Sequence, residues 1–354
     1  MSYLSEALSN YYLEQGRHLP WRKNQDPYPI WLSEIMLQQT RIEAVIPYFD
    51  AFIEAFPTVE DLAKAPLDEV TKKWEGLGYY SRARNLKKAA EVIVNQYEGV
   101  FPFEKKILLS LPGIGEYTAA AIRCFAFDQK DVPVDGNLLR IFARLNLFPD
   151  NVLDASSKKK CHDYFLKTFD DARPSLYMQG LMELGERICL PLGEAKCEEC
   201  PLACICKAKQ QGLQRSFPVR IKPSKKRKEN KTVLVLRQNG RYFYEKREPI
   251  GLLASLYGFP LLEGHLSSKQ VKERLIMEGY TVSSVKKLKP YIHHFSHITW
   301  DMSAFLIDLA LESRVSENLL ALTLEERKNH FALPSAFAPI EADASVLHRK
   351  PSKN

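Results

Sequence analysis

The sequence lacks any stretch that would cross a membrane as a helix. Its longest uncharged run, Pro249 to Leu262, has 14 residues and includes two prolines and two glycines, whereas a spanning helix needs about 20 apolar residues. The first ten residues, MSYLSEALSN, lack the basic region and apolar core of a secretory signal. We therefore expect a cytoplasmic protein with no membrane partner.

Cysteine is scarce, with seven residues in a chain of 354, yet five of the seven lie between Cys189 and Cys206. Disulfides are rare in the cytoplasm, so clustered cysteines there are more often metal ligands. The chain also lacks internal repeats. Its length exceeds what one hydrophobic core usually serves, which predicts two domains.

The spacing of the clustered cysteines narrows the choice of metal. Seven residues separate Cys189 from Cys197, two separate Cys197 from Cys200, and five separate Cys200 from Cys206. Two C-x-x-C pairs would indicate zinc, but this loop has only one. The uneven spread favours a [4Fe–4S] cluster, with zinc and buried free thiols as alternatives. Cys204 is out of register and is not expected to be a ligand.

Positive charge is in mild excess, and it is unevenly distributed. The net charge is +7, and the segment from Lys207 to Lys231 holds ten lysines and arginines against one acid, Glu229. Such a run is either a solvated linker or a basic strap near a polyanion. Net charge alone identifies no partner.

The hydrophobic pattern changes along the chain. In residues 1–206 apolar positions recur at spacings of three and four, as in IPYFDAFIEAF and LLRIFARLNLF, which predicts helices. Residues 207–230 have no apolar period and read as a basic linker. Residues 231–354 predict a smaller α+β domain, with a hairpin at Asn239-Gly240 and a helix over 267–277.

Two turns in the helical part bear residues suited to chemistry. In LPGIGEYTA, Gly113 and Gly115 form a sharp turn that opens a helix, and their backbone N–H groups can face a phosphate. In VPVDGN, Asp135 stands at another helix start, as a capping residue would. Each motif is common by itself.

Taken together, these motifs resemble a known superfamily. LPGIGEYTA, VDGN and the cysteine loop are similar to the helix-hairpin-helix DNA glycosylases, in their iron–sulfur branch. The stretches RHLPWR, WLSEIMLQQTR and GLGYYSRARNL resemble the MutY-type adenine DNA glycosylases, and HHFSHITW resembles a motif of their Nudix-related C-terminal domain. The family has six residues between its first two cluster cysteines, where this chain has seven.

The resemblance implies a fold and an activity. Residues 1–206 would be a mainly α helix-hairpin-helix glycosylase domain with its iron–sulfur loop at 189–206, and residues 231–354 a Nudix-like recognition domain. The segment GHLSSKQVKERLIMEGY has too few glutamates for a Nudix hydrolase. The implied function is monofunctional removal of adenine opposite 8-oxoguanine or guanine in double-stranded DNA, by a monomeric enzyme of base excision repair near the bacterial-type nucleoid.

Two carboxyl groups are the candidate catalytic residues. Glu34 has apolar neighbours in WLSEIMLQQT, which predicts a raised pKa, and the resemblance makes it the acid that protonates adenine. The helix start at Asp135 favours its ionised form, and the resemblance assigns it to the oxocarbenium-like sugar, oriented by Asn137. The alternatives are a surface glutamate and a plain helix cap.

Tyr117 stands where relatives that also cut the DNA backbone carry a lysine. Tyrosine forms no Schiff base, so the resemblance implies a hydroxyl that positions Asp135 or a water. A tyrosine that only packs its helix is the alternative.

Adenine in a duplex is inaccessible until it is flipped out. By resemblance, Gln38 and Tyr79 wedge into the base stack beside Leu37, and core packing or a solvated turn is the alternative for most of these positions. The other implied contacts are Gln39 and Thr40 to the opposite oxidised guanine, Trp21, Arg22 and Gln179 around the adenine, and Ser296 and His297 to 8-oxoguanine from the second domain.

Two rival functions differ in class. One is an endonuclease III-like glycosylase/lyase for oxidised pyrimidines, which the missing lysine at 117 and the second domain disfavour. The other is a non-catalytic DNA-binding protein with a structural cluster, which the presence of both Glu34 and Asp135 disfavours.

Overall fold

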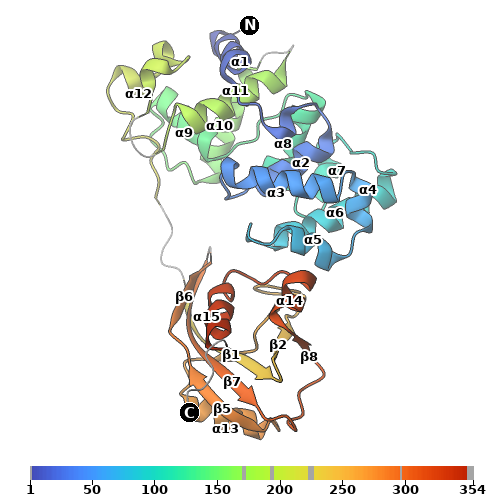
Figure 1. Cartoon of the computed structure of the whole chain (residues 1–354). Helices are drawn as coiled ribbons and strands as arrows, with labels where there is room; N and C mark the ends of the chain where they lie inside the picture. The colour runs from blue at the N-terminus through green and yellow to red at the C-terminus, as the bar shows by residue number, and fades with distance from the viewer. Residues whose placement is uncertain (1, 170–172, 192–194, 222–226, 296, 349–354) are drawn as a thin grey trace. The chain divides into compact units, whose positions relative to one another are not determined.

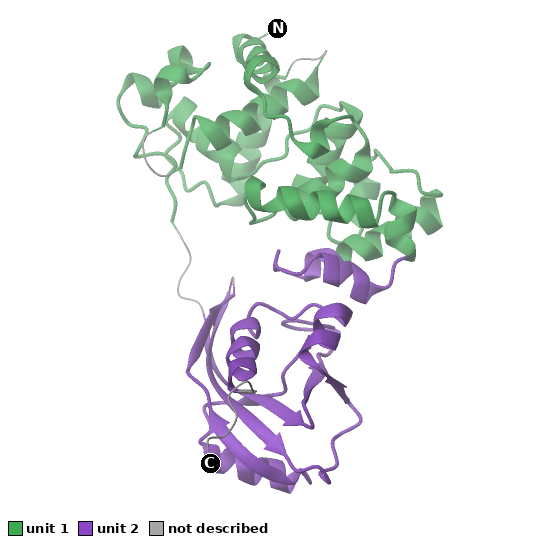
Figure 2. Ribbon diagram, viewed as in Figure 1, with its two compact units in different colours: residues 1–64, 85–223 green, residues 65–84, 224–354 purple. Residues whose placement is uncertain are grey.

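A computed structural model describes residues 2–169, 173–191, 195–221, 227–295 and 297–348 of the chain (Figure 1). The chain divides into two compact units (Figure 2). Unit 1 contains residues 1–64 and 85–223, and unit 2 contains residues 65–84 and 224–354. The sequence-based boundaries differ in two respects, because they place residues 65–84 with the first domain and treat 207–230 as a linker, whereas the structure divides that segment between the units at residues 223 and 224.

Unit 1 is helical throughout its described residues. None of the helices described in either unit is long and apolar enough to cross a membrane. Helix α6 starts inside segment 65–84 and continues into unit 1. The helical elements are α1 (Tyr3–Gln15), η1 (Pro20–Arg22), α2 (Pro27–Met36), α3 (Ile42–Ala55), α4 (Val59–Lys64), α6 (Ser81–Tyr97), α7 (Lys105–Ser110), α8 (Glu116–Phe127), α9 (Gly136–Asn146), α10 (Ala155–Lys167), α11 (Pro174–Arg187), η2 (Cys197–Glu199), η3 (Ala203–Ile205) and α12 (Lys207–Gln210).

The glycine turn predicted from LPGIG connects α7 to α8 and forms a helix-hairpin-helix. Gly113 has φ 79°, and a Cβ there would lie 2.7 Å from the Cβ of Asn85, so a side chain would be both strained and crowded. Gly115 is the N-cap of α8 and is exposed, as is Gly113. The turn therefore presents backbone at the surface, as a phosphate contact requires.

The first half of α8 packs in the interior of unit 1. The alanines at 119–121 are fully buried, and their small side chains let α8 pack closely on α2. Helix α9 begins with Asp135 as its N-cap, and Asp135 lines the same cavity as Tyr117 of α8. Thr58 accepts the Asp61 N–H at 3.2 Å at the start of α4.

Unit 2 is built on a mixed sheet. The strand order is β3-β2-β1-β7-β5, with β4 paired to β1, β6 to β7 and β8 to β2. Only the β1–β7 pairing is parallel among the described strands. The elements are α5 (Leu67–Lys73), β1 (Arg227–Gln238), β2 (Arg241–Lys246), β3 (Tyr257–Gly258), β4 (Leu261–Glu263), α13 (Ser268–Met277), β5 (Val282–Lys287), β6 (Tyr291–His294), β7 (Ile298–Leu309), β8 (Leu319–Leu322), α14 (Leu324–His330) and α15 (Ala338–His348).

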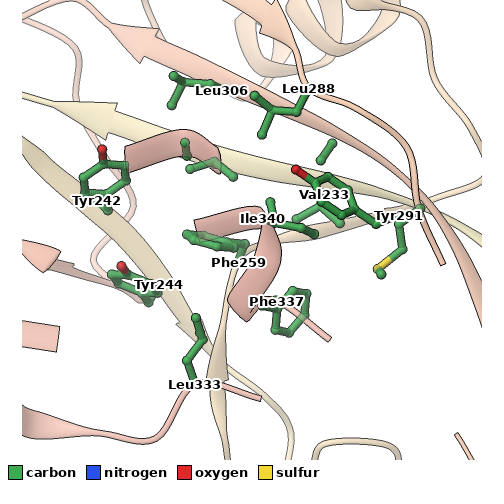
Figure 3. Packing of buried hydrophobic residues seen from close by; sticks show 14 of the residues in the cluster. Val233, Tyr242, Tyr244, Phe259, Leu288, Tyr291, Leu306, Leu333, Phe337 and Ile340 are labelled. Atoms are coloured by element: carbon green, nitrogen blue, oxygen red, sulfur yellow. The ribbon is translucent and has the colours of Figure 1, made fainter. Parts of the chain in front are cut away.

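The sheet is covered on both faces. On one face Val233 and Val235 join a core with residues of α15 and the segment before it, including Phe337 and Ile340 (Figure 3). On the other face neighbouring side chains of β1 pack against α13. Strand β1 is therefore buried on both sides, which its uninterrupted apolar run Val233 to Leu236 requires.

Several local predictions for unit 2 agree with the structure. Asn239 and Gly240 have φ 47° and 74° between β1 and β2, as a two-residue hairpin turn needs. Ser267 caps α13 in a reciprocal capping box with Gln270. Strand β1 starts at Arg227, inside the segment read as linker. The predicted fold class, a helical first domain and a smaller α+β second domain, is confirmed.

Candidate active site

A cavity of about 690 Å³ opens among α2, α8, α9 and α11 of unit 1. It unites residues that are far apart in the sequence, from Tyr12 to Glu186. Of the predicted site residues, those that line it are Trp21, Arg22, Glu34, Leu37, Gln39, Thr40, Tyr117, Asp135, Asn137 and Gln179. The sequence motifs thus converge on one pocket.

Glu34 lies on α2 and is 8% exposed. Burial raises the pKa of its carboxyl to about 7, and the charge of Asp135 adds to the rise. A hydrogen bond from the Tyr117 hydroxyl to Oε2, at 2.8 Å, and the Arg22 charge act in the opposite direction. Near neutral pH this carboxyl therefore holds a proton part of the time, which suits a proton donor.

Tyr117 has a different partner from the one expected. The resemblance implies that its hydroxyl serves Asp135 or a water, whereas in the structure it donates to Glu34. Burial and the neighbouring carboxylates hold the pKa of Tyr117 well above its ordinary value. The hydroxyl therefore stays protonated and acts as a donor that orients the Glu34 carboxyl.

Asp135 is half-buried in the cavity wall at the start of α9. Its Oδ1 accepts the backbone N–H groups of Asn137 at 2.9 Å and Leu138 at 2.8 Å. These bonds and Arg140 favour the carboxylate, as the sequence analysis expects of a helix start, but burial outweighs them and raises the pKa to about 6. The helix start therefore favours the ionised form as expected, burial opposes it, and Asp135 remains mostly ionised at pH 7.

The Asn137 side chain is held by α11 rather than by Asp135. Its Nδ2 donates to Glu186 at 2.8 Å, and its Oδ1 accepts from Arg140 at 2.7 Å. Arg140 also donates through Nε to the carbonyl of Cys189 at 2.6 Å. Asn137 therefore orients Asp135 through its backbone N–H, while its side chain connects α9 to α11.

Arg140 and Arg144 are functional candidates that the sequence analysis does not single out. They are 4% and 5% exposed, and Arg144 Nη1 lies 3.2 Å from the sulfur of Cys189. Two arginines four residues apart within the apolar pattern LLRIFARLNLF would have indicated buried guanidinium groups with specific partners. They connect the helix of Asp135 to the cysteine loop.

A second group of contacts surrounds Gln179 on α11. Its Oε1 accepts from the Tyr12 hydroxyl, and its Nε2 donates to Ser175 Oγ at 3.0 Å. The guanidinium of Arg22 lies 5.5 Å from the centre of the Tyr12 ring. Glu183, which is fully buried, binds Arg22 at 2.6 Å.

These contacts fix the polar wall of the pocket. Glu183 also pairs with Arg17 at 2.9 Å, so one carboxylate binds two arginines. Tyr12 and Glu183 are absent from the sequence predictions, because α1 and α11 meet only in the folded chain. An amide held in this way can pair with the donor and acceptor edge of a base.

The remaining predicted contacts do not gather in this pocket. Gln38 is half-buried and its Nε2 lies 3.5 Å from Thr118 Oγ1, and it does not line the cavity. Tyr79 and His297 belong to unit 2, where both line a separate cavity of about 570 Å³. Ser296 lies outside the described residues.

The four predicted cluster ligands, in contrast, do converge. Cys189, Cys197, Cys200 and Cys206 line one small cavity together with Arg144 and Gln214. Cys204 is exposed and donates to the Tyr3 hydroxyl instead, at 3.0 Å. Among the described residues no three potential ligands are arranged to hold a single metal ion. Four thiols around one space are a donor set that either zinc or an iron–sulfur cluster takes.

Comparison with known families agrees with this architecture. Residues 32–166 match the HhH-GPD superfamily base excision DNA repair protein family, and residues 232–342 match the NUDIX domain family. A thermostable thymine-DNA glycosylase structure aligns with a TM-score of 0.53 and 30% identity, covering 58% of this chain and 95% of its own. The class is therefore a helix-hairpin-helix base excision repair protein with an added Nudix-like domain.

Curated relatives define the family more narrowly. The adenine DNA glycosylase of Buchnera aphidicola subsp. Baizongia pistaciae is 33% identical over 302 residues, which cover 83% of each chain. The human adenine DNA glycosylase is 29% identical over 368 residues, covering 87% of this chain and 67% of its own. The chain belongs to the adenine DNA glycosylase family, and the resemblance drawn from the motifs is confirmed.

Proposed function

We propose that this protein removes adenine from double-stranded DNA where adenine is mispaired with 8-oxoguanine or guanine. The related adenine DNA glycosylases support the reaction. The observation that carries the proposal is the pair of carboxyl groups, Glu34 and Asp135, on one cavity, with pKa values raised to about 7 and about 6.

The two carboxyls suit the two demands of the reaction. The leaving adenine must gain a proton, and Glu34 is the group with the higher pKa and a Tyr117 hydroxyl to orient it. The sugar develops positive charge as the bond breaks, and Asp135 supplies the negative charge on that side. A positioned general acid contributes typically about 10²–10⁴-fold to such a reaction.

Access to the bond requires base flipping. The cavity of about 690 Å³ is large enough for an extruded base. Trp21, Arg22 and Gln179 would hold the adenine there, while Leu37, Gln38 and Tyr79 would fill the stack. Gln39 and Thr40 would contact the opposite base, and Gly113 and Gly115 a backbone phosphate.

We propose hydrolysis without strand cleavage. No lysine lines the cavity among the described residues, and Tyr117 occupies the position where a lysine would attack the sugar. An abasic site would therefore be the product, and the strand would break only on treatment with alkali.

The cysteine cavity supports a [4Fe–4S] cluster held by Cys189, Cys197, Cys200 and Cys206. When bound, the cluster would fix the 189–206 loop and its basic side chains. Iron analysis of anaerobically purified protein should give about four irons per chain, with Cys204→Ser unchanged and Cys200→Ser depleted. Stoichiometric zinc in place of iron would contradict this assignment.

The second domain, residues 231–354, would read the oxidised base, and the basic segment 207–230 would join it to the glycosylase domain 1–206. We propose that the protein acts as a monomer on the chromosomal DNA of the cytoplasm. Ser296 and His297 are the proposed contacts to 8-oxoguanine.

The test is incubation of the full chain with duplexes that carry adenine opposite 8-oxoguanine, guanine or thymine, with and without alkali. We expect adenine release opposite 8-oxoguanine and guanine, and strand breaks only after alkali. Strand breaks without alkali together with borohydride trapping would favour a glycosylase/lyase. Binding without base release would indicate a non-catalytic protein.

A further inference from the structure

Segment 65–84 has polar attachments to the rest of unit 2 on both sides of Tyr79. On one side, Oε1 of Glu75 accepts the backbone N–H of Leu333 at 2.9 Å. On the other side, Nη1 of Arg84 donates to the carbonyl of Ala254 at 2.6 Å. The turn that carries Tyr79 is therefore held at both ends by the part of the chain that forms the Nudix-like domain.

The Glu75 attachment is backed by a buried charge network. Arg327 on α14 is 6% exposed, and its Nη1 lies 3.5 Å from Oε1 of Glu75. Its Nε donates to Glu341 of α15 at 2.9 Å, and the Tyr244 hydroxyl donates to the same Glu341 oxygen at 2.9 Å. A buried guanidinium between two carboxylates has little freedom to move, because it is bound or faced by a partner on each side. The network gives Glu75 a fixed anchor.

The backbone between the two attachments is strained. Gly76, Gly78 and Tyr79 have φ of 104°, 70° and 48°, and a tyrosine in the left-handed region is unfavourable unless its surroundings hold it there. The guanidinium of Arg82 lies 5.4 Å from the centre of the Tyr79 ring and donates to the carbonyl of Gly78 at 3.2 Å. The ring itself remains 43% exposed.

The partner loop is strained as well. Leu253 and Ser255 have φ of 59° and 57°, and they flank the Ala254 carbonyl that binds Arg84. Together with Tyr79 and His297, this loop lines the cavity of about 570 Å³. Left-handed residues on two loops joined by one hydrogen bond indicate that each loop holds the other in place.

We propose that Glu75 and Arg84 are positioning residues through which the second domain sets the place of Tyr79. The proposal rests on the proposed function, in which Tyr79 enters the base stack and the second domain reads the oxidised base. Contact of the second domain with that base and insertion of Tyr79 would then be one coupled event. Binding of the oxidised base by the second domain would then favour insertion of Tyr79, and the reverse, through these two attachments.

The experiment uses the full chain and a duplex with adenine opposite 8-oxoguanine, with 2-aminopurine next to the mispair to report unstacking. Glu75→Gln keeps an oxygen for the Leu333 N–H but removes the charge that faces Arg327, and Arg84→Ala removes the donor to Ala254. Each change should lower both the fluorescence rise and the single-turnover rate by about three- to tenfold. In a Tyr79→Ala background neither change should lower them further.

A matched control is Asp308→Asn, which makes the same acid-to-amide change in unit 2. Asp308 binds Arg237 at 2.6 Å and Ser284 at 2.8 Å, away from segment 65–84. It should leave both readouts unchanged. Losses by Glu75→Gln that persist in full in the Tyr79→Ala background, or equal losses by Asp308→Asn, would overturn the coupling. If Tyr79→Ala alone changes neither readout, the insertion role in the proposed function fails first.

Discussion

The two cavities of this protein differ in how far their polar side chains are exposed to water. In unit 1 the cavity wall withdraws Glu34 and Asp135 from water, and their pKa values rise to about 7 and about 6. In unit 2 the cavity is bordered by Tyr79 and His297, which remain exposed. Groups with shifted pKa values suit proton transfer, whereas exposed aromatic and imidazole groups suit binding. Changes in the first cavity should therefore affect the rate, and changes in the second should affect discrimination.

The largest expected effect is that of Glu34→Gln. The amide fills the same space but cannot supply the proton, so single-turnover release of adenine should fall by about 10³-fold or more, within the upper range for general acids. Binding to the mispaired duplex should be retained. Glu116→Gln, at an exposed position in the first turn of α8, is the control and should behave as wild type. Normal release of adenine by Glu34→Gln would show that Glu34 is not the proton donor and would contradict a catalytic role for the first cavity.

Asp135→Asn should follow closely. Asparagine is as good a helix cap as aspartate, so α9 should remain folded, while the loss of charge beside the sugar should lower the rate by about 10²–10³-fold. Thermal unfolding by circular dichroism checks the first statement, and single-turnover kinetics check the second. A large drop in melting temperature would mean that Asp135 mainly holds the fold.

The rate should depend on pH in a narrow bell. Burial raises both pKa values, so as pH rises through about 7, Glu34 loses its proton and the rate falls. As pH drops through about 6, Asp135 gains a proton and loses its charge, and the rate falls again. At pH 9 the rate should be about 100-fold below its maximum, since tenfold is lost per unit. Single-turnover profiles from pH 4.5 to 9 test this, and a profile flat above pH 7 would contradict the role of Glu34.

The smallest expected effect belongs to the second cavity. His297→Ala should lower the preference for 8-oxoguanine over guanine opposite adenine by about tenfold, since one good base contact is worth about 1–3 kcal/mol. The rate on adenine opposite guanine should change much less. His265, which is exposed on the same unit and does not line this cavity, is the control position. Equal losses on both duplexes would indicate that His297 supports the fold.

The sequence predicted most of what depends on local order. Asp135 follows from VDGN because a helix cap is a short-range feature, and the raised pKa of Glu34 follows from its apolar neighbours. The cysteine loop follows from spacing alone. These features are readable because each is determined within about ten residues of chain.

The features that the sequence did not predict depend on contacts between segments that are far apart in the chain. Tyr12 reaches Gln179 across 167 positions, and Glu75 reaches Leu333 across 258. The bond from Tyr117 to Glu34 is of the same kind, since the motif fixes where the hydroxyl starts but not that α2 brings Glu34 to it. Burial also raises the pKa of Asp135, and the sequence does not show this because the depth of a helix start is a property of the whole fold.

The ion pair of Arg327 with Glu341 has a consequence for biosynthesis. Arg327 belongs to α14, but its partner arrives only with α15, together with Phe337 and Ile340 of the sheet core. A nascent chain that ends after α14 contains Arg327, which is buried in the folded domain, but lacks its partner Glu341. Premature termination before residue 338 would therefore leave a permanently incomplete domain, and such a product should be recognised by cellular proteases as misfolded even though every residue of the first cavity is present.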